Sequence, residues 1–297
     1  MYHNPVMLAE CIEGLCIKPD GVYVDLTFGG SGHSREIIQH LDQNGRLIAF
    51  DQDEDTMGNA INDARFTLVT QNFRYMKNFL RFYKAIPVDG ILADLGISSH
   101  HIDDPDRGFA TRFDGPLDMR MNRNQDLTAA DIVNSYSEDK LRYLFTYYGE
   151  IENSRLLAAA IVKSRHNKIN TVEQFKSVIR ILVPKKIENK YLAQVFQALR
   201  IEVNDELGAL QAALKQVPEV LIQGGRLVVI SYHSLEDRLV KNFIRSGNIE
   251  GEIQKDFFGN KITVLDPVNR KAIIPAPEEM ERNPRSRSAK LRIAMKR

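Results

Sequence analysis

The sequence is poor in cysteine and contains no apolar run long enough to cross a membrane. Its two cysteines, Cys11 and Cys16, are too few for a disulfide framework and do not have the spacing of a metal site. They lie in an apolar stretch, so we expect them to be buried in a helix face. The N-terminus does not resemble a signal peptide. We therefore expect a cytoplasmic protein with no membrane partner.

The sequence also lacks an excess of either charge. Its formal net charge is +1, which gives no overall field that would demand an anionic partner. The hydrophobic fraction of 43% and the charged fraction of 27% are ordinary for a globular protein. A length of 297 residues predicts two domains or one enlarged domain.

The most informative stretch is Val22–Ser34, where a short β-rich run passes into a glycine-rich turn and then into a helical pattern. The turn is Gly29-Gly30-Ser31-Gly32. Glycines let a backbone turn tightly and approach a ligand, and the free amides at a helix N-terminus favour electron-rich groups. Taken alone, this pattern fits a plain connection between strand and helix as well as it fits a nucleotide-type site.

An acidic residue downstream favours the nucleotide-type site. Gly45–Asp51 reads as a second strand and ends on Asp51, 26 positions after Asp25. A carboxylate at this point can accept both hydrogen bonds of a ribose diol, whereas the alternative role is to cap the helix that follows. The turn does not fit the dinucleotide pattern G-x-G-x-x-G, because Arg35 stands three positions after Gly32. The sequence therefore favours S-adenosylmethionine, which has no pyrophosphate, over a dinucleotide.

Two further strands extend this pattern. Phe66–Thr70 is the third, and the nearby Phe73 is predicted either to stack on an adenine or to be a core aromatic. Val88–Leu95 has the near-continuous apolar run of a central parallel strand and includes Asp94 close to its end. Ligands bind at the carboxyl ends of such strands, so we expect Asp94 to share an edge with Asp51.

The pattern changes after the fourth strand. Residues 100–124 form a long polar loop, and its apolar residues argue against disorder because they give it something to bury. Its arginines are predicted to meet either phosphates or the interleaved aspartates. The adjacent histidines at its start have no spaced set of further ligands, so no metal is predicted. Residues 126–189 read as helices, with Thr128 and Thr171 as N-caps.

The strand pattern resumes after this helical stretch. Tyr191–Val217 is predicted to be one long amphipathic helix, followed by a fifth strand that ends near His233. Ser234 is the expected N-cap of the next helix, and a structural role is favoured for His233. The stretch from Arg282 to the end holds seven basic residues and no acidic one, which suits either RNA phosphates or a charged edge strand.

Together these segments resemble the bacterial 16S rRNA (cytosine-N4)-methyltransferases, in family order and over nearly the whole chain. The matching segments are H-N-P-V-M-L, D-L-T-F-G-G-S-G-H-S, D-L-G-I-S-S, R-G-F-A-T-R-F-D-G-P-L-D-M-R-M, Y-G-E-I-E-N-S-R, F-Q-A-L-R-I-E-V-N-D-E-L, S-Y-H-S-L-E-D-R-L-V-K and N-P-R-S-R-S-A-K-L-R.

The resemblance implies an α/β fold: a class I, Rossmann-like methyltransferase domain with an inserted all-helical domain. We place the methyltransferase domain at residues 1–104 and 190–297, and the inserted domain, for substrate recognition, at residues 105–189. The implied cofactor is S-adenosylmethionine, with contacts at Ser31, Gly32, His33, Asp51, Phe73, Asp94 and His101. The family usually has Pro-Gln where this chain has His100-His101, so the side-chain contact at His101 differs from the family pattern.

The implied reaction is methylation of the exocyclic N4 amine of a cytidine in the decoding region of 16S rRNA, within the small ribosomal subunit. Direct in-line transfer needs alignment and hydrogen-bond acceptors for the amine but no covalent intermediate. We assign Asp94 and Ser98 to the amine pocket. A homodimer is the candidate assembly. The alternatives are another RNA substrate, a non-catalytic RNA-binding ribosome-assembly factor and, disfavoured by the turn, a nicotinamide-dependent dehydrogenase.

Overall fold

The computed structural model describes residues 5–297, so His3 and Asn4 of the first family segment lie outside the described residues. The chain divides into two compact units. One ends at Gly96 and resumes as Leu207–Arg297, and the other is Ile97–Glu206. The expected boundaries, after residues 104 and 189, differ from this division at both ends. The reason is packing, because Phe109 of the polar loop and Phe196 of a later helix both belong to the core of the helical unit.

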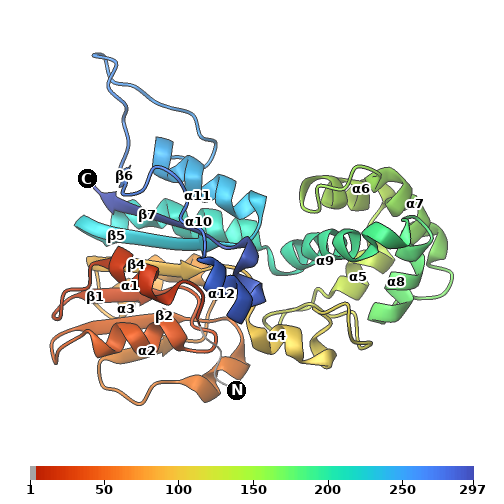
Figure 1. The fold of residues 1–297 in the computed structure, drawn as a ribbon, viewed down its shortest axis with the longest axis horizontal. Coiled ribbons are helices and arrows are strands. Elements are labelled where there is room, and N and C mark those ends of the chain that lie inside the picture. The colour runs from red at the N-terminus through yellow and green to blue at the C-terminus, as the bar shows by residue number, and fades with distance from the viewer. Residues whose placement is uncertain (1–4) are drawn as a thin grey trace. The chain divides into compact units, whose positions relative to one another are not determined.

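The first unit contains a seven-stranded sheet in the order β3-β2-β1-β4-β5-β7-β6 (Figure 1). Its strands are β1 (Val22–Asp25), β2 (Arg46–Phe50), β3 (Phe66–Val69), β4 (Val88–Asp94), β5 (Leu221–Ser231), β6 (Leu265–Pro267) and β7 (Lys290–Lys296). Strands β1 to β5 pair in parallel, and β7 runs antiparallel between β5 and β6. The α/β, Rossmann-like expectation is therefore confirmed, whereas β7 as an edge strand is wrong. The three-residue β6 is too short to leave a sequence pattern.

Helices cover both faces of this sheet. They are α1 (Leu8–Leu15), α2 (Gly32–Gln39), α3 (Met76–Phe82), α10 (Glu206–Val220) and α11 (Ser234–Ser246), and the short α12 (Pro277–Arg282), which buries no residue, also belongs to this unit. Neighbouring strand residues alternate between two cores: Tyr23 packs with residues of α1 and α2, and Val24 with residues of α3, α10 and α11. Cys11 is buried in α1 as expected, but Cys16, at the end of that helix, is exposed, so the prediction for Cys16 is wrong.

The second unit is helical throughout its regular structure. It contains α4 (Ser99–Asp103), α5 (Ala129–Ser135), α6 (Glu138–Tyr147), α7 (Ser154–Ser164), α8 (Val172–Arg180) and α9 (Glu188–Asn204). Thr128 and Thr171 each cap a helix with a reciprocal capping box, as predicted. The single helix expected over Tyr191–Val217 is wrong, because Asp205 has a φ of 45° and separates α9 from α10. The left-handed backbone at that residue ends the helix.

The polar loop at the start of the helical unit is ordered by its own charges. Arg120 pairs with Asp118, and Arg112 with Asp103. Arg107 is buried and donates to the carbonyl oxygens of Arg120 and Met121. The aspartate and backbone partners therefore account for these arginines within the protein.

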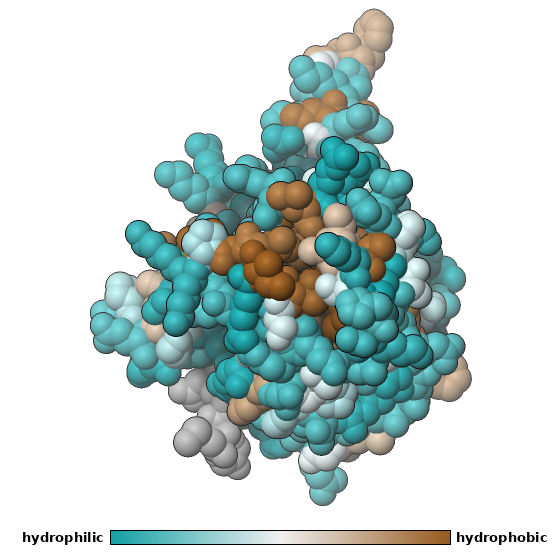
Figure 2. Space-filling model, turned by 90° about the vertical axis from the view of Figure 1, so that its right-hand side faces the viewer, coloured by the Kyte–Doolittle hydropathy of each residue, from teal (hydrophilic) through white to brown (hydrophobic). Residues whose placement is uncertain are grey.

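Figure 2 looks onto the helical unit and shows apolar side chains gathered on its surface. Leu156 of α7 is 62% exposed, and Ile181, which follows α8, is 86% exposed. Across residues 5–297, no helix is both long enough and apolar enough to cross a membrane.

Candidate cofactor and active site

The glycine-rich turn connects β1 to α2 in a way that leaves the helix without a side-chain cap. Ser31 has a φ of 68° and stands before the first residue of α2, but its hydroxyl makes no capping hydrogen bond. That hydroxyl instead accepts a hydrogen bond from Arg35 Nε at 2.8 Å. The N-terminal amides of α2, which begin at Gly32, therefore keep the partial positive charge that attracts an anionic group.

Asp25, the last residue of β1, holds this turn closed. Its Oδ2 accepts a 2.7 Å hydrogen bond from the Ser34 hydroxyl, and its Oδ1 accepts one from the backbone amide of Thr27 at 3.0 Å. The Thr27 hydroxyl in turn accepts the Asp94 backbone amide at 2.7 Å. The ends of β1 and β4 are thereby joined through side chains, which fixes Asp94 relative to the turn.

Asp51 follows β2 and reaches the same turn. Its Oδ2 accepts the Gly29 amide at 2.8 Å, and its Oδ1 accepts the Asp53 amide at 2.9 Å. Burial raises the pKa of Asp51 to about 6, although these two amide bonds lower it. The capping role falls instead to Asp53, which accepts the Asp55 amide. Asp51 therefore stands against the glycine turn with lone pairs remaining on both oxygens.

Asp94, at the end of β4, is the centre of a second cluster. Its Oδ1 accepts a 2.6 Å hydrogen bond from the Tyr232 hydroxyl, and its Oδ2 lies 3.8 Å from His33 Nδ1. The other ring nitrogen of His33 is 3.0 Å from the Val6 carbonyl oxygen, which can only accept, so we place a proton on Nε2. Burial raises the pKa of Asp94 to about 6 against the lowering effects of His33 and Tyr232. Burial and the Asp94 charge raise the pKa of Tyr232.

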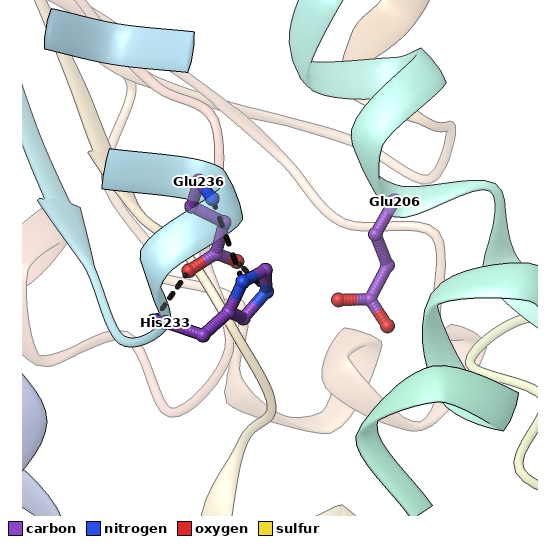
Figure 3. A group of neighbouring side chains, drawn as sticks. All are labelled: Glu206, His233 and Glu236. Carbon is purple, nitrogen blue, oxygen red and sulfur yellow. Dashed lines mark hydrogen bonds and ion pairs between the residues drawn. The ribbon is translucent and has the colours of Figure 1, made fainter. Parts of the chain in front are cut away.

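His233 and Glu236 complete this edge of the sheet after β5. The His233 side chain accepts the Glu236 amide as the N-cap of α11, and the Glu236 carboxylate accepts the backbone amide of His233 (Figure 3). The same carboxylate also accepts the backbone amide of Tyr232. The structural role favoured for His233 is therefore confirmed, whereas Ser234 as the N-cap is wrong. This capping box fixes Tyr232, the donor to Asp94.

The predicted site residues divide between the two units. Ser31, Gly32, His33, Asp51, Phe73 and Asp94 belong to the sheet unit, at the carboxyl ends of β1 to β4. Phe73 is partly buried against the sheet core at the start of the short helix that follows β3. Ser98 and His101 belong to the helical unit, where the Ser98 hydroxyl accepts the His101 amide and the His101 ring stacks on Phe109 at 4.9 Å. The role of Ser98 in the amine pocket and the contact of His101 with the cofactor stay predictions.

Sequence reasoning missed the residues that hold the site in place. Thr27 and Ser34 lie within the turn that attracted attention, but only the hydrogen bonds reveal their role. Tyr232 comes directly before His233 in the sequence, and its link to Asp94 joins residues that are 138 positions apart. The sequence signal that could have identified Tyr232 is its position, as a polar aromatic residue, at the end of a buried strand.

Comparison with known proteins identifies the family of the chain. The model of the MraW methylase family matches residues 1–297. Proteins from Bacteroides thetaiotaomicron and Cytophaga hutchinsonii, both named ribosomal RNA small subunit methyltransferase H, are 58% and 56% identical to the chain. Each alignment covers 99% of this chain, and 97% and 99% of the relative. Among solved structures, an rRNA methylase from Streptococcus thermophilus matches over 100% of this chain and 98% of its own at 11% identity, with a TM-score of 0.42.

Proposed function

Because the chain belongs to the MraW methylase family, we propose that it transfers the methyl group of S-adenosylmethionine to the N4 amine of a cytidine in the decoding region of 16S rRNA, within the small ribosomal subunit. The relatives named as small-subunit rRNA methyltransferases support the substrate class. The observation that carries the proposal is the arrangement of Asp51 against the glycine turn and of half-buried Asp94, which is tied to the same turn through Thr27.

The donor set of the sheet unit fits the cofactor. Both Asp51 oxygens keep a lone pair after accepting one backbone amide each, and the ribose diol offers two donors. The uncapped amides at the start of α2 suit the carboxylate of the methionine moiety. Phe73 is the predicted contact for the adenine ring. When bound, the cofactor supplies a methyl group already activated on a positively charged sulfur.

The chemistry that this chain must add is alignment and a hydrogen-bond acceptor. The amine of cytosine is a weak nucleophile because its lone pair is delocalised into the ring. Asp94 carries a carboxylate that is held by Tyr232, and burial has raised its pKa to about 6, so it accepts a proton more readily than an ordinary aspartate. We propose that the ionised Asp94 accepts a hydrogen bond from the amine as it attacks. Ser98 is proposed to shape the same pocket.

The two units then have separate roles. We propose that the sheet unit holds the cofactor and that the helical unit, expected at residues 105–189 and observed as Ile97–Glu206, recognises the substrate. His101 is proposed as a further cofactor contact. We also propose that the protein acts in the cytoplasm. Association of two copies is supported by the exposed apolar side chains of the helical unit and is tested by sedimentation of a Leu156→Lys variant.

The experiment that tests the function is transfer of a labelled methyl group to small subunits that lack the modification, followed by nucleoside analysis. Label in N4-methylcytidine is the expected result. Label in another nucleoside, or in another RNA only, would support the alternative that the enzyme methylates another RNA substrate. Cofactor binding without transfer to any RNA would leave the non-catalytic assembly factor.

A further inference from the structure

A hairpin between α11 and β6 projects from the sheet unit and ends in two exposed aromatic side chains (Figure 1). Phe257 is 98% exposed and Phe258 is 85% exposed, and their rings meet edge to face at 5.7 Å. Side chains of this size are normally used to build a core or an interface. Two of them at the tip of a projecting hairpin contribute nothing to the core of this chain.

The tip of this hairpin is an ordered turn. Asp256 Oδ1 accepts the backbone amides of Phe258 and Asn260 at 2.9 and 2.8 Å, and its Oδ2 accepts the Asn260 side chain at 3.0 Å. Gly259 takes a φ of 83°, which closes the turn with a hydrogen bond to the Asp256 carbonyl. Hydrogen bonds from Asn260 lower the pKa of Asp256. The acidic group is thus used inside the turn, which presents both phenylalanines outward on a fixed support.

Two lysines stand directly behind the aromatic tip. Lys255 and Lys261 are partners in an antiparallel bridge, and the flanking hydrogen bonds join Gln254 to Ile262 and Asp256 to Asn260. That pattern makes the lysines a non-hydrogen-bonded pair, in which opposing side chains leave the same face and lie close together. Like charges in this position repel. Within residues 5–297, no carboxylate forms an ion pair with either lysine, so the repulsion is not relieved inside the chain.

Exposed aromatic rings next to paired cations match the chemistry of single-stranded RNA. Bases stack on aromatic side chains, and the backbone supplies a phosphate beside each base. A phosphate between Lys255 and Lys261 would replace a repulsion by two attractions. A purely apolar partner surface would use the phenylalanines but would leave the lysines repelling each other.

We propose that this hairpin is a second RNA contact, in which Phe257 and Phe258 stack on an unpaired base of the small-subunit rRNA and Lys255 and Lys261 bind the adjacent phosphates. This inference rests on the proposed function, because it takes the substrate to be RNA. It assigns the hairpin to substrate docking and not to the transfer step. The hairpin should therefore affect KM for the subunit and leave kcat and cofactor affinity unchanged.

The test uses the full chain and small subunits that lack the modification. The Phe257→Leu/Phe258→Leu variant keeps apolar surface but loses the rings, and the Phe257→Tyr/Phe258→Tyr variant keeps the rings. With stacking on a base, the leucine variant should raise KM by roughly 5- to 150-fold and the tyrosine variant should stay near wild type. The matched control is Phe82→Ala, which removes a phenylalanine that is 76% exposed on α3 and should change nothing.

The lysine pair is tested by salt. Lys255→Ala/Lys261→Ala should weaken subunit binding and reduce the dependence of log K on log salt by about 1 to 2. Equal KM values for the leucine and tyrosine variants, or an unchanged salt dependence, would overturn the proposal. Normal affinity in the leucine variant but low affinity in a Phe257→Ala/Phe258→Ala variant would overturn the proposal in favour of an apolar protein pocket. Wild-type enzyme that binds the cofactor but methylates no subunit would defeat the proposed function, and direct binding to the subunit would then still test the hairpin.

Discussion

Two acidic residues of the candidate site in the sheet unit differ sharply from two paired acidic residues in the helical unit. In the sheet unit, Asp51 and Asp94 are half-buried and form no ion pair with an arginine or lysine of the described residues, and burial raises both pKa values to about 6. In the helical unit, burial also raises the pKa of Asp118, but hydrogen bonds from Arg120 outweigh it and lower the pKa overall. Glu173, paired with Lys176 and Arg180, has a lowered pKa as well. Asp51 and Asp94 leave negative charge for a ligand to stabilise, whereas Asp118 and Glu173 are paired with basic side chains of the chain itself.

This contrast separates function from stability. A carboxylate with a raised pKa opposes folding at neutral pH, because the folded state holds its charge less well than the unfolded chain does. This destabilisation is offset when a bound ligand stabilises the charged carboxylate. The proposed cofactor has a positively charged sulfur and ribose hydroxyls that would do so. An acid paired with arginine contributes to stability at neutral pH and offers a ligand little. We therefore expect substitution of Asp94 and substitution of Asp118 to change the free energy of unfolding in opposite directions at neutral pH.

The largest expected effect follows from Asp94→Asn. Asparagine keeps an acceptor for the Tyr232 hydroxyl but cannot hold the charge or take a proton. The rate of methyl transfer should fall by at least about 100-fold, the usual effect of removing a group that acts in general acid–base catalysis. The measurement is the rate of label transfer to small subunits at saturating cofactor. Full turnover by this variant would remove Asp94 from the mechanism.

The same variant should be more stable than wild type above pH 6. Because the folded pKa exceeds the unfolded value, the stabilisation from Asp94 is complete below about pH 4 and is lost as the pH rises through 6. Asparagine avoids that loss, which is on the order of 3 kcal/mol. The matched control is Asp118→Asn, which should destabilise the protein by roughly 1–2 kcal/mol at pH 8 because Arg120 loses its partner. Urea unfolding at pH 4 and pH 8 checks both signs.

The next effect is on cofactor affinity. Asp51→Asn replaces one carboxylate oxygen by an amide nitrogen that donates, so one of the two acceptors proposed for the ribose is lost. Loss of one charge-assisted hydrogen bond of about 1.5–3 kcal/mol should weaken cofactor binding by roughly 10- to 150-fold. Calorimetric titration measures this directly. Asp63→Asn, which removes an exposed partner of Arg65 in the same unit, should leave affinity unchanged.

The pH dependence of the reaction should expose the same charge. If Asp94 must be ionised, kcat falls about tenfold per pH unit below 6 and is level above it. The descending limb should be absent from the residual activity of Asp94→Asn. A profile that is flat from pH 5 to 8 in the wild type would contradict the assignment. The profile should be recorded at saturating cofactor, so that titration of Asp51 does not enter.

How far the sequence predicts this molecule depends on the range of the interactions. The parallel strands and the capping residues Thr128 and Thr171 follow from local patterns, and the sequence predicted them. The break at Asp205 did not follow, because the apolar spacing continues through it and only the positive φ ends the helix. The domain boundaries were misplaced because the loop after β4 buries its apolar residues in the helical core.

The candidate site shows the same limit. Asp51 and Asp94 could be placed at a common edge, since parallel strands bring their ends together. Their raised pKa values could not be predicted from the sequence, because the burial of these carboxylates depends on residues from distant parts of the chain. The bond between Tyr232 and Asp94 joins β4 to the end of β5 across the inserted helical unit. Such a pairing leaves no trace in spacing, and the structure alone identifies Tyr232 as the residue that orients Asp94.

The smallest expected effect comes from a difference at two helix N-termini: α8 has a side-chain N-cap, whereas α2 has none. Thr171 of α8 accepts the Gln174 amide in a capping box, so Thr171→Ala should cost about 1 kcal/mol of stability and leave cofactor affinity unchanged. Ser31 makes no capping bond to α2, so Ser31→Ala should cost less stability but weaken cofactor binding several-fold, as expected for a residue beside the ligand. Thermal unfolding and calorimetric titration of both variants test this reversal. If Ser31→Ala behaved like Thr171→Ala in both measurements, the start of α2 would be an ordinary helix end, and the assignment of the glycine turn to cofactor binding would lose its physical basis.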